Sequence, residues 1–176
     1  MFHVERVCDT DVEDAYDVLR VVAEWLKSLG RRQRISATSF DTYLRWQSAG
    51  ANWIVREDAD MAGVFTVIPE TLDVWPSVTE EVPVLRALAT HPDWRGRGVG
   101  AFGIEAALEI ARPHELLYLD CVSDFLPSYY AAHGFEKVAR QDRTIDGEPW
   151  DITLMRRRTM DSRGDPPGDP SAEASA

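Results

Sequence analysis

A run of glycines and arginines in the middle of the chain has the composition of a loop that binds an anion. The run Arg95-Gly96-Arg97-Gly98-Val99-Gly100 places glycine at alternate positions. Glycine has no side chain, so the backbone can approach a ligand closely. Successive N–H groups and the N-terminus of a following helix can converge on an anion, and the two arginines add charge-assisted donors. We expect this loop to bind a pyrophosphate.

Two other nucleotide-binding loops have to be weighed against this interpretation. A Walker A loop ends in Gly-Lys-Ser or Gly-Lys-Thr, and the sequence contains neither, which excludes it. The stretch 98–103 does match G-x-G-x-x-G, and Asp120 lies about where a ribose-binding acid belongs. However, the polar segment 90–97 separates the preceding strand from the first of these glycines, and few residues remain to complete a parallel sheet. Gly103 is as easily explained by close packing of a helix on a sheet, so we disfavour a dinucleotide site.

The elements that must position this loop follow from the hydrophobic pattern. Alternating or continuous apolar residues predict strands at 2–8, 52–56, 61–68, 82–89, 116–121, 135–140 and 150–155. Helical spacing and capping residues predict helices at 12–29, 39–47, 99–111 and 125–132. The prolines and polar residues of 69–81 indicate a loop. This order predicts an α/β (α+β) fold with a mixed, mostly antiparallel central sheet and helices on both faces.

Length and composition set the class of protein. The 176 residues suit one domain over 1–158, and the Pro, Gly, Ser, Asp and Ala of 159–176 predict a disordered tail. No apolar run is long enough to span a bilayer and no signal architecture opens the chain, so we expect a cytoplasmic protein without a membrane partner. Only Cys8 and Cys121 are present, and we expect no metal. The net charge of −11 disfavours nucleic acid as a partner.

The segment 87–100 resembles the acyl-CoA-binding motif of the GNAT superfamily of N-acetyltransferases. That motif is Arg or Gln, two residues, Gly, one residue, then Gly or Ala, and 95–100 fits it fully. The stretch 117–121 is similar to the fifth strand of the family, and 129–135, Tyr-Tyr-Ala-Ala-His-Gly-Phe, is similar to its tyrosine helix and Gly-Phe exit. In element order the resemblance covers roughly 2–155, and its specific motifs lie between Val82 and Phe135.

The resemblance implies a GNAT-like fold in which the fourth and fifth strands splay apart around acetyl-CoA, a co-substrate. Backbone of the fourth strand would pair with the pantetheine amides, and one of its N–H groups would polarise the thioester carbonyl. The family often has Asn where this sequence has Ser123, although helix capping explains that serine at least as well. The expected cofactor-binding residues are therefore Leu88, Ala89, Thr90, Arg95, Gly96, Arg97, Gly98, Val99, Gly100, Ala101, Ser123 and Tyr130.

For catalysis the resemblance points to Tyr130, which lies five residues before Phe135. We expect its hydroxyl to protonate the departing thiolate, and we expect Tyr129 to point to a different face of the helix. Many relatives carry a glutamate within the fourth strand, where this sequence has Val84. Glu81, at the start of that strand, could act as the general base through a water, beside Glu80. Asp120 is an alternative, and an amine that binds deprotonated needs no strong base.

The sequence therefore predicts an N-acetyltransferase that transfers the acetyl group from acetyl-CoA to a primary amine of a small molecule, by direct attack in a ternary complex. A non-catalytic acyl-CoA-binding regulatory domain of the same fold is the alternative. Protein amines stay open as acceptors, as does assembly into a homodimer. Trp25, Trp46, Trp53 and Trp75 lie in or near the elements expected to bind the acceptor, and aromatic walls would suit a cationic amine.

Overall fold

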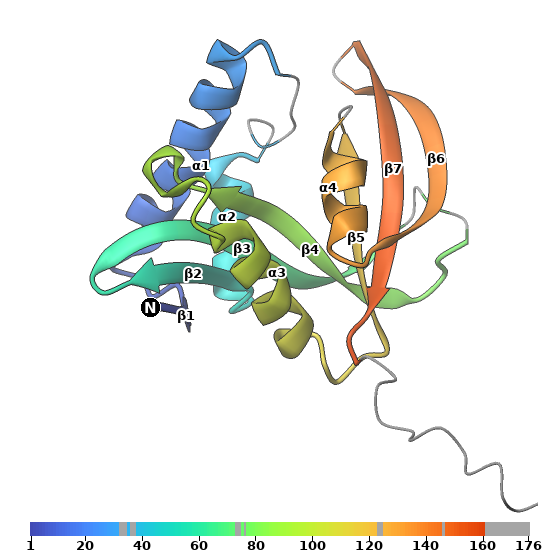
Figure 1. Cartoon of the computed structure of the whole chain (residues 1–176). Helices are drawn as coiled ribbons and strands as arrows, with labels where there is room; N and C mark the ends of the chain where they lie inside the picture. The colour runs from blue at the N-terminus through green and yellow to red at the C-terminus, as the bar shows by residue number, and fades with distance from the viewer. Residues whose placement is uncertain are drawn as a thin grey trace, which may run out of the picture.

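A mixed sheet forms the centre of the protein (Figure 1). The computed structural model describes residues 1–31, 35, 38–72, 75, 77–122, 125–145 and 147–160. Within these residues seven strands pair in the order β1-β2-β3-β4-β5-β7-β6, and only β4 and β5 run parallel. The strands are β1 (Phe2–Arg6), β2 (Asn52–Glu57), β3 (Asp60–Thr71), β4 (Glu81–Thr90), β5 (Leu116–Val122), β6 (Glu136–Ile145) and β7 (Glu148–Arg158). The predicted mostly antiparallel sheet is confirmed. A doubly wound dinucleotide-binding fold has a mostly parallel sheet, so this topology differs from it.

Helices cover both faces of the sheet. In Figure 1, α3 (Val99–Ile110) and α4 (Leu126–Ala132) lie in front of it, and α1 (Val12–Ser28) and α2 (Phe40–Ser48) lie behind it. Successive side chains of β3 point to opposite faces of the sheet, so β3 contributes to the hydrophobic core on both faces. Phe65 belongs to the core under α3 and α4, whereas Val64 belongs to the core under α1 and α2. A third cluster, which includes Val84 and Val122, lies on the α1/α2 face over strands β4, β5 and β7.

Strands β3 and β4 extend into the segment that we predicted to be a loop. β3 continues through Pro69 to Thr71, and β4 begins at Glu81. Pro69 lies opposite Pro83, so the two missing N–H donors fall on one pair of the ladder instead of two. Each strand continues on both sides of its proline.

The β6–β7 hairpin is also longer than the hydrophobic pattern predicted. Charged residues at positions 136, 137, 140, 142 and 143 leave β6 without the regular apolar alternation that sequence reasoning relies on. They are accommodated by exposed cross-strand ion pairs, such as Arg156 with Glu136 at 2.7 Å.

The C-terminal boundary lies slightly beyond the predicted one. Strand β7 ends at Arg158, and the backbone N–H of Thr159 donates to the carbonyl of Glu115 at 3.1 Å. Thr159 is thus held by the domain. The rest of the predicted tail, from 161 to 176, lies outside the described residues. No helix within the described residues is long and apolar enough to cross a membrane.

Candidate functional site

The two parallel strands separate soon after they meet. β4 and β5 pair at a single position, Val84 with Tyr118. Beyond that pair lies a cavity of about 1060 Å³, at the carboxyl ends of the strands, where ligands bind in open α/β sheets. Leu85 and Cys121 line it from the α3/α4 side, and Arg86 lines it from the α1/α2 side. The cavity therefore passes through the sheet from one face to the other.

A bulge in β4 shapes one wall of this cavity. Val64 pairs with Ala89 and Thr66 pairs with Arg86, so Ala87 and Leu88 together lie opposite a single residue of β3. Ala87 has a φ of +51°, which is uncommon for a residue other than glycine. The bulge interrupts the ladder with β3, and residues 85–90 all line the cavity. The expected positions Leu88, Ala89 and Thr90 are among them.

The glycine-rich loop and the start of α3 form a second wall. Gly96 and Gly98 have φ values of +74° and +85°, and a Cβ on either would have no heavy atom within 4 Å, so open space lies in front of them. Gly98 accepts from the N–H of Phe102 at 2.9 Å, so the N–H groups of the three residues between them have no partner within the helix. Of the expected loop residues, Arg95, Gly96, Gly98, Val99, Gly100 and Ala101 line the cavity.

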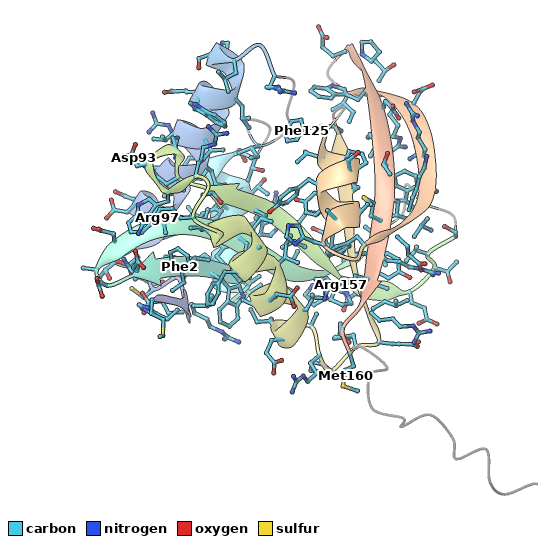
Figure 2. All side chains as sticks on the ribbon, in the orientation of Figure 1. Phe2, Asp93, Arg97, Phe125, Arg157 and Met160 are labelled. Atoms are coloured by element: carbon cyan, nitrogen blue, oxygen red, sulfur yellow. The ribbon has the colours of Figure 1, made fainter. Side chains whose placement is uncertain are left out.

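Arg97 is the loop residue that does not line the cavity. Its guanidinium donates to Glu57 at 2.6 Å and lies 4.1 Å from the ring centroid of Trp94. Figure 2 shows it on the outer side of the loop, away from α4. This contact links the loop to Glu57 at the end of β2. The other arginine, Arg95, lies 3.8 Å from the ring centroid of Trp25 on the cavity wall.

Tyr130, on α4, is one of the residues that line the cavity. Its side chain is 8% exposed and packs edge-on against Phe135, with ring centroids 5.7 Å apart. Burial raises the pKa of Tyr130 above its ordinary value, and Cys121 and Tyr129 add smaller shifts in the same direction. The hydroxyl therefore holds its proton at neutral pH. Burial also raises the pKa of the Cys121 thiol, to about 12, which leaves that thiol protonated and unreactive.

Tyr129 points to a different face of α4 from Tyr130, as expected, but it does not point away from the cavity. Tyr129 lines the cavity as well, and its hydroxyl lies 2.5 Å from the position that a Cβ on Gly100 would take. Its ring also contacts His133, with centroids 4.7 Å apart. Successive helical residues point about 100° apart, and the cavity extends far enough around α4 to reach both tyrosines. Tyr129 faces the start of α3, whereas Tyr130 faces the gap between the strands.

A charged cluster on the α1/α2 face forms the floor of the cavity just beyond the paired position. Arg86 donates to Asp120 at 2.6 Å and to Glu70 at 2.7 Å. The three residues come from adjacent strands, and their side chains are at most 27% exposed. Burial disfavours the charge on Arg86, but the two carboxylates outweigh it and raise the pKa of Arg86 above its ordinary value. Two carboxylates face one guanidinium, so the cluster carries a net charge of about −1.

The structure separates the candidate bases. Asp120 lines the cavity, whereas Glu81 does not. Glu81 is exposed and pairs with Thr71 at the far end of β4, about 17 Å along the strand from Arg86. Ser123 lies outside the described residues. Among the described residues, no group of three His, Cys, Asp or Glu side chains could hold a metal ion.

Two of the four tryptophans that were expected near the acceptor line the cavity, and two do not. Trp25 and Trp46 line the cavity, whereas Trp53 stacks on Phe65 and Trp75 is buried in the third core cluster. Sequence reasoning missed the floor cluster. An arginine inside the nearly continuous apolar run of 82–89 was a usable signal, because a charge in a buried strand requires a partner.

The comparisons with known proteins agree with this geometry. Residues 19–135 match the family model described as "Acetyltransferase (GNAT) family". No curated protein sequence matches the chain.

Solved structures share the fold at low sequence identity. An acetyltransferase of the GNAT family from Listeria monocytogenes is 21% identical, with a TM-score of 0.71 over 89% of this chain and 94% of that one. The ribosomal-protein-S18-alanine N-acetyltransferase from Escherichia coli is 17% identical, with a TM-score of 0.66 over 93% and 98%. A protein provisionally described as a phosphinothricin N-acetyltransferase is 16% identical, with a TM-score of 0.67 over 92% and 100%. These neighbours include enzymes named for a protein acceptor and for a small-molecule acceptor.

Proposed function

The chain belongs to the GNAT family of acetyltransferases, and from this premise we propose that it transfers the acetyl group of acetyl-CoA to the primary amine of a small molecule, by direct attack in a ternary complex. The observation that carries the proposal is the cavity that passes through the sheet. It joins the N-terminus of α3 on one side to the partly buried cluster of Arg86, Glu70 and Asp120 on the other, with Tyr130 on its wall.

The residues on the α3 side suit acetyl-CoA. The N–H groups at the start of α3, the open space before Gly96 and Gly98, and Arg95 would hold the pyrophosphate. The bulged edge of β4 would pair with the pantetheine amides in the manner of an added strand. Tyr129, whose hydroxyl lies over Gly100, would contact the same arm.

The lining of the acceptor side supports a small molecule as the acceptor. The cavity volume of about 1060 Å³ includes the acetyl-CoA side, and it is slightly above the usual range of about 300 to 1,000 Å³ for small-molecule sites. Apolar residues of α1, of the N-cap of α4 and of β7 line the acceptor side, including Leu26, Phe125 and Ile152. Apolar walls of this kind suit the stem of a small amine.

Each catalytic group of the chain has one task. Bound acetyl-CoA supplies a thioester, whose carbonyl carbon forms the new C–N bond as its C–S bond breaks. Tyr130 holds a proton at Oη and donates it to the departing sulfur. The floor cluster attracts the ammonium form of the acceptor, and Asp120 takes the proton that the nitrogen must lose before it attacks. We assign the base role to Asp120 in place of Glu81 because Asp120 lines the cavity and Glu81 does not.

The proposal is tested by thiol release from acetyl-CoA across a library of small amines. Asp120→Asn and Tyr130→Phe should each lower the rate of acetyl transfer while acetyl-CoA still binds. Glu81→Gln is the matched control for Asp120→Asn, since it replaces a carboxylate by an amide outside the cavity, and it should retain the full rate. If acetyl-CoA binds and no amine accelerates thiol release, the non-catalytic binding domain becomes the better interpretation. Equal losses in Glu81→Gln and Asp120→Asn would overturn the base assignment.

A further inference from the structure

The charges that line the cavity differ in sign from the charge of the whole chain. The chain carries a formal charge of −11. Among the described residues that line the cavity, four arginines face two carboxylates: Arg31, Arg86, Arg95 and Arg143 against Glu70 and Asp120. Among these described residues the excess is two positive charges, and such a surplus in so acidic a protein suits an anionic ligand.

Two of the four arginines belong to regions of the cavity that were described above. Arg86 is held by the floor cluster, and Arg95 lies beside the glycine-rich loop. The remaining two approach from elements that border the acceptor side. Arg31, after the end of α1, packs over the ring of Phe125 at 5.0 Å. Arg143, on β6, is half-buried and has no ion pair within the described residues. Among the residues that the structure describes, Arg143 is thus a charge at the cavity wall without a counter-ion.

The strand register places Arg143 on the same face of the sheet as Asp120. Val122 pairs with Ile152, which in turn pairs with Gln141, and Arg143 lies two residues further along β6. Counting four residues along the strands and two strands across, the Cα atoms of Asp120 and Arg143 are about 16 Å apart. Val122 and Ile152 line the cavity between them.

The acceptor side therefore has a negative floor, apolar walls and a positive rim. In Figure 1 the upper part of the β6–β7 hairpin, which carries Arg143, stands across from the upper end of α1. An ammonium group suits the floor, where the net charge is about −1. A carboxylate or phosphate suits the guanidinium at the rim, which can donate two parallel hydrogen bonds.

We propose that the acceptor is a primary amine that carries an anionic group at the other end of an apolar stem. This inference rests on the proposed acetyltransferase function and names its acceptor class. A neutral alkylamine leaves Arg143 without a partner. A diamine places a second positive charge against Arg143 and is the poorest fit.

The test compares matched acceptors. The probes are ω-aminoalkanoates of increasing length, their primary amides, the corresponding diamines, and ω-aminoalkyl phosphates. Thiol release from acetyl-CoA is measured with each. We expect kcat/KM to be higher for an anionic probe than for its neutral amide by about 10-fold or more, the range of a hydrogen bond to a charged group. The diamine should be slower than the amide. The carboxylate and phosphate arms identify which anion is preferred.

Two arginine variants show whether Arg143 is the cause. Arg143→Gln should raise KM for the anionic probe by about 10-fold, with little change in kcat, and leave the neutral amide unaffected. Arg140→Gln is the matched control. Arg140 lies on the same strand, on the opposite face, in an exposed ion pair with Asp151, and removing it changes the net charge equally. Arg140→Gln should keep the preference for the anionic probe.

Three results would overturn the inference while leaving the proposed function intact. They are equal or better use of amides or diamines, an unchanged preference in Arg143→Gln, and an equal loss of preference in Arg140→Gln. Acetyl transfer to other amines without transfer to any anionic probe would overturn it in the same way as the first result. Failure of every amine in the library, with acetyl-CoA bound, would instead overturn the proposed function and the inference with it.

Discussion

The Arg86 guanidinium donates to the Asp120 carboxylate at 2.6 Å directly beyond the point where β4 and β5 separate. Each residue lies two positions after the single paired position, Val84 with Tyr118. The ion pair therefore links the two strands where their backbones no longer pair. Replacing a buried ion pair by apolar residues is often neutral for stability, so its contribution here is best sought in the position that it gives to Asp120.

The first prediction concerns Arg86. Arg86→Met should lower the free energy of unfolding by about 3 kcal/mol, because it leaves two partly buried carboxylates without their counter-ion. The measurement is urea unfolding at neutral pH. The triple variant Arg86→Met, Glu70→Gln, Asp120→Asn removes those charges as well and should recover part of the loss. A single variant as stable as the wild type would show that the carboxylates do not depend on Arg86.

The order of the elements could be predicted because each segment carries its own period or capping residue. Alternation marked the strands, and Ser39 caps α2 by accepting from the Thr42 N–H at 3.2 Å. From the sequence, Gly103 is explained either as part of a dinucleotide-binding motif or by close packing of a helix on the sheet. The structure agrees with close packing, because a Cβ on Gly103 would lie 3.0 Å from Leu88. The GNAT-like motifs then located the cavity wall correctly at the glycine-rich loop and at Tyr130.

The bulge at Ala87 could not be predicted, because alanine carries no signal for a positive φ. It arises from tertiary packing. A Cβ on Gly63 would lie 2.7 Å from the carbonyl oxygen of Ala89 and 2.9 Å from Val99, so this glycine lets β3 approach β4 and α3 closely beside the bulge. A glycine inside a strand is a general indicator of close backbone approach, but it does not identify which neighbour is deformed.

The division of labour between adjacent residues also lay beyond the sequence. Arg95 and Arg97 are the same residue type in the same loop, yet Arg95 lines the cavity and Arg97 pairs with Glu57. Helical spacing separated Tyr129 from Tyr130 correctly, but it contains no information on how far the cavity extends around α4. Likewise, Arg86 indicated a buried partner, while only the strand register brings Glu70 and Asp120 to it.

The second prediction concerns the anion-binding wall. Gly98→Val should weaken acetyl-CoA binding by at least about 10-fold, because it strains a left-handed position and puts a side chain into the space before the α3 terminus. Calorimetric titration with acetyl-CoA measures this loss. Gly147→Val is the matched control, since Gly147 has a similar φ of +80° and equally open surroundings in the β6–β7 turn. Undiminished affinity in a folded Gly98→Val variant would remove the loop from the site.

The third prediction concerns the pH dependence of stability. The pKa of the Cys121 thiol is raised to about 12, and that of Tyr130 is raised above its ordinary value of about 10. Both shifts favour the neutral form in the folded state. Their stabilisation is therefore fully present below the ordinary pKa values and is lost as the pH rises through the raised ones. The free energy of unfolding should fall above about pH 9, by up to about 1.4 kcal/mol per pH unit for each group.

Unfolding in urea between about pH 8 and pH 11 measures this slope. Cys121→Ala should flatten the curve from about pH 9 and Tyr130→Phe from about pH 10, whatever their effects at neutral pH, because each removes one group that the unfolded state ionises first. Slopes identical to the wild type in both variants would contradict the burial of these two groups.

The last prediction separates the chemical roles of the two tyrosines of α4. Tyr130→Phe keeps the ring and its packing on Phe135 and removes only the hydroxyl. If that hydroxyl protonates the departing thiolate, the single-turnover rate of acetyl transfer should fall by about 10²- to 10⁴-fold. The dissociation constant of acetyl-CoA should change little, since the interaction strengthens only as charge develops on sulfur.

Tyr129→Phe gives the opposite pattern, because its hydroxyl lies over Gly100 at the anion-binding wall. We expect weaker acetyl-CoA binding and a single-turnover rate close to that of the wild type once the cofactor is saturating. The two variants differ by one position on the same helix and remove the same atom, so each controls for the other. The measurement is single-turnover transfer at saturating amine, with acetyl-CoA dissociation constants for both. A full rate in Tyr130→Phe, or a large loss of rate at saturation in Tyr129→Phe, would mean that Tyr130 is not the proton donor.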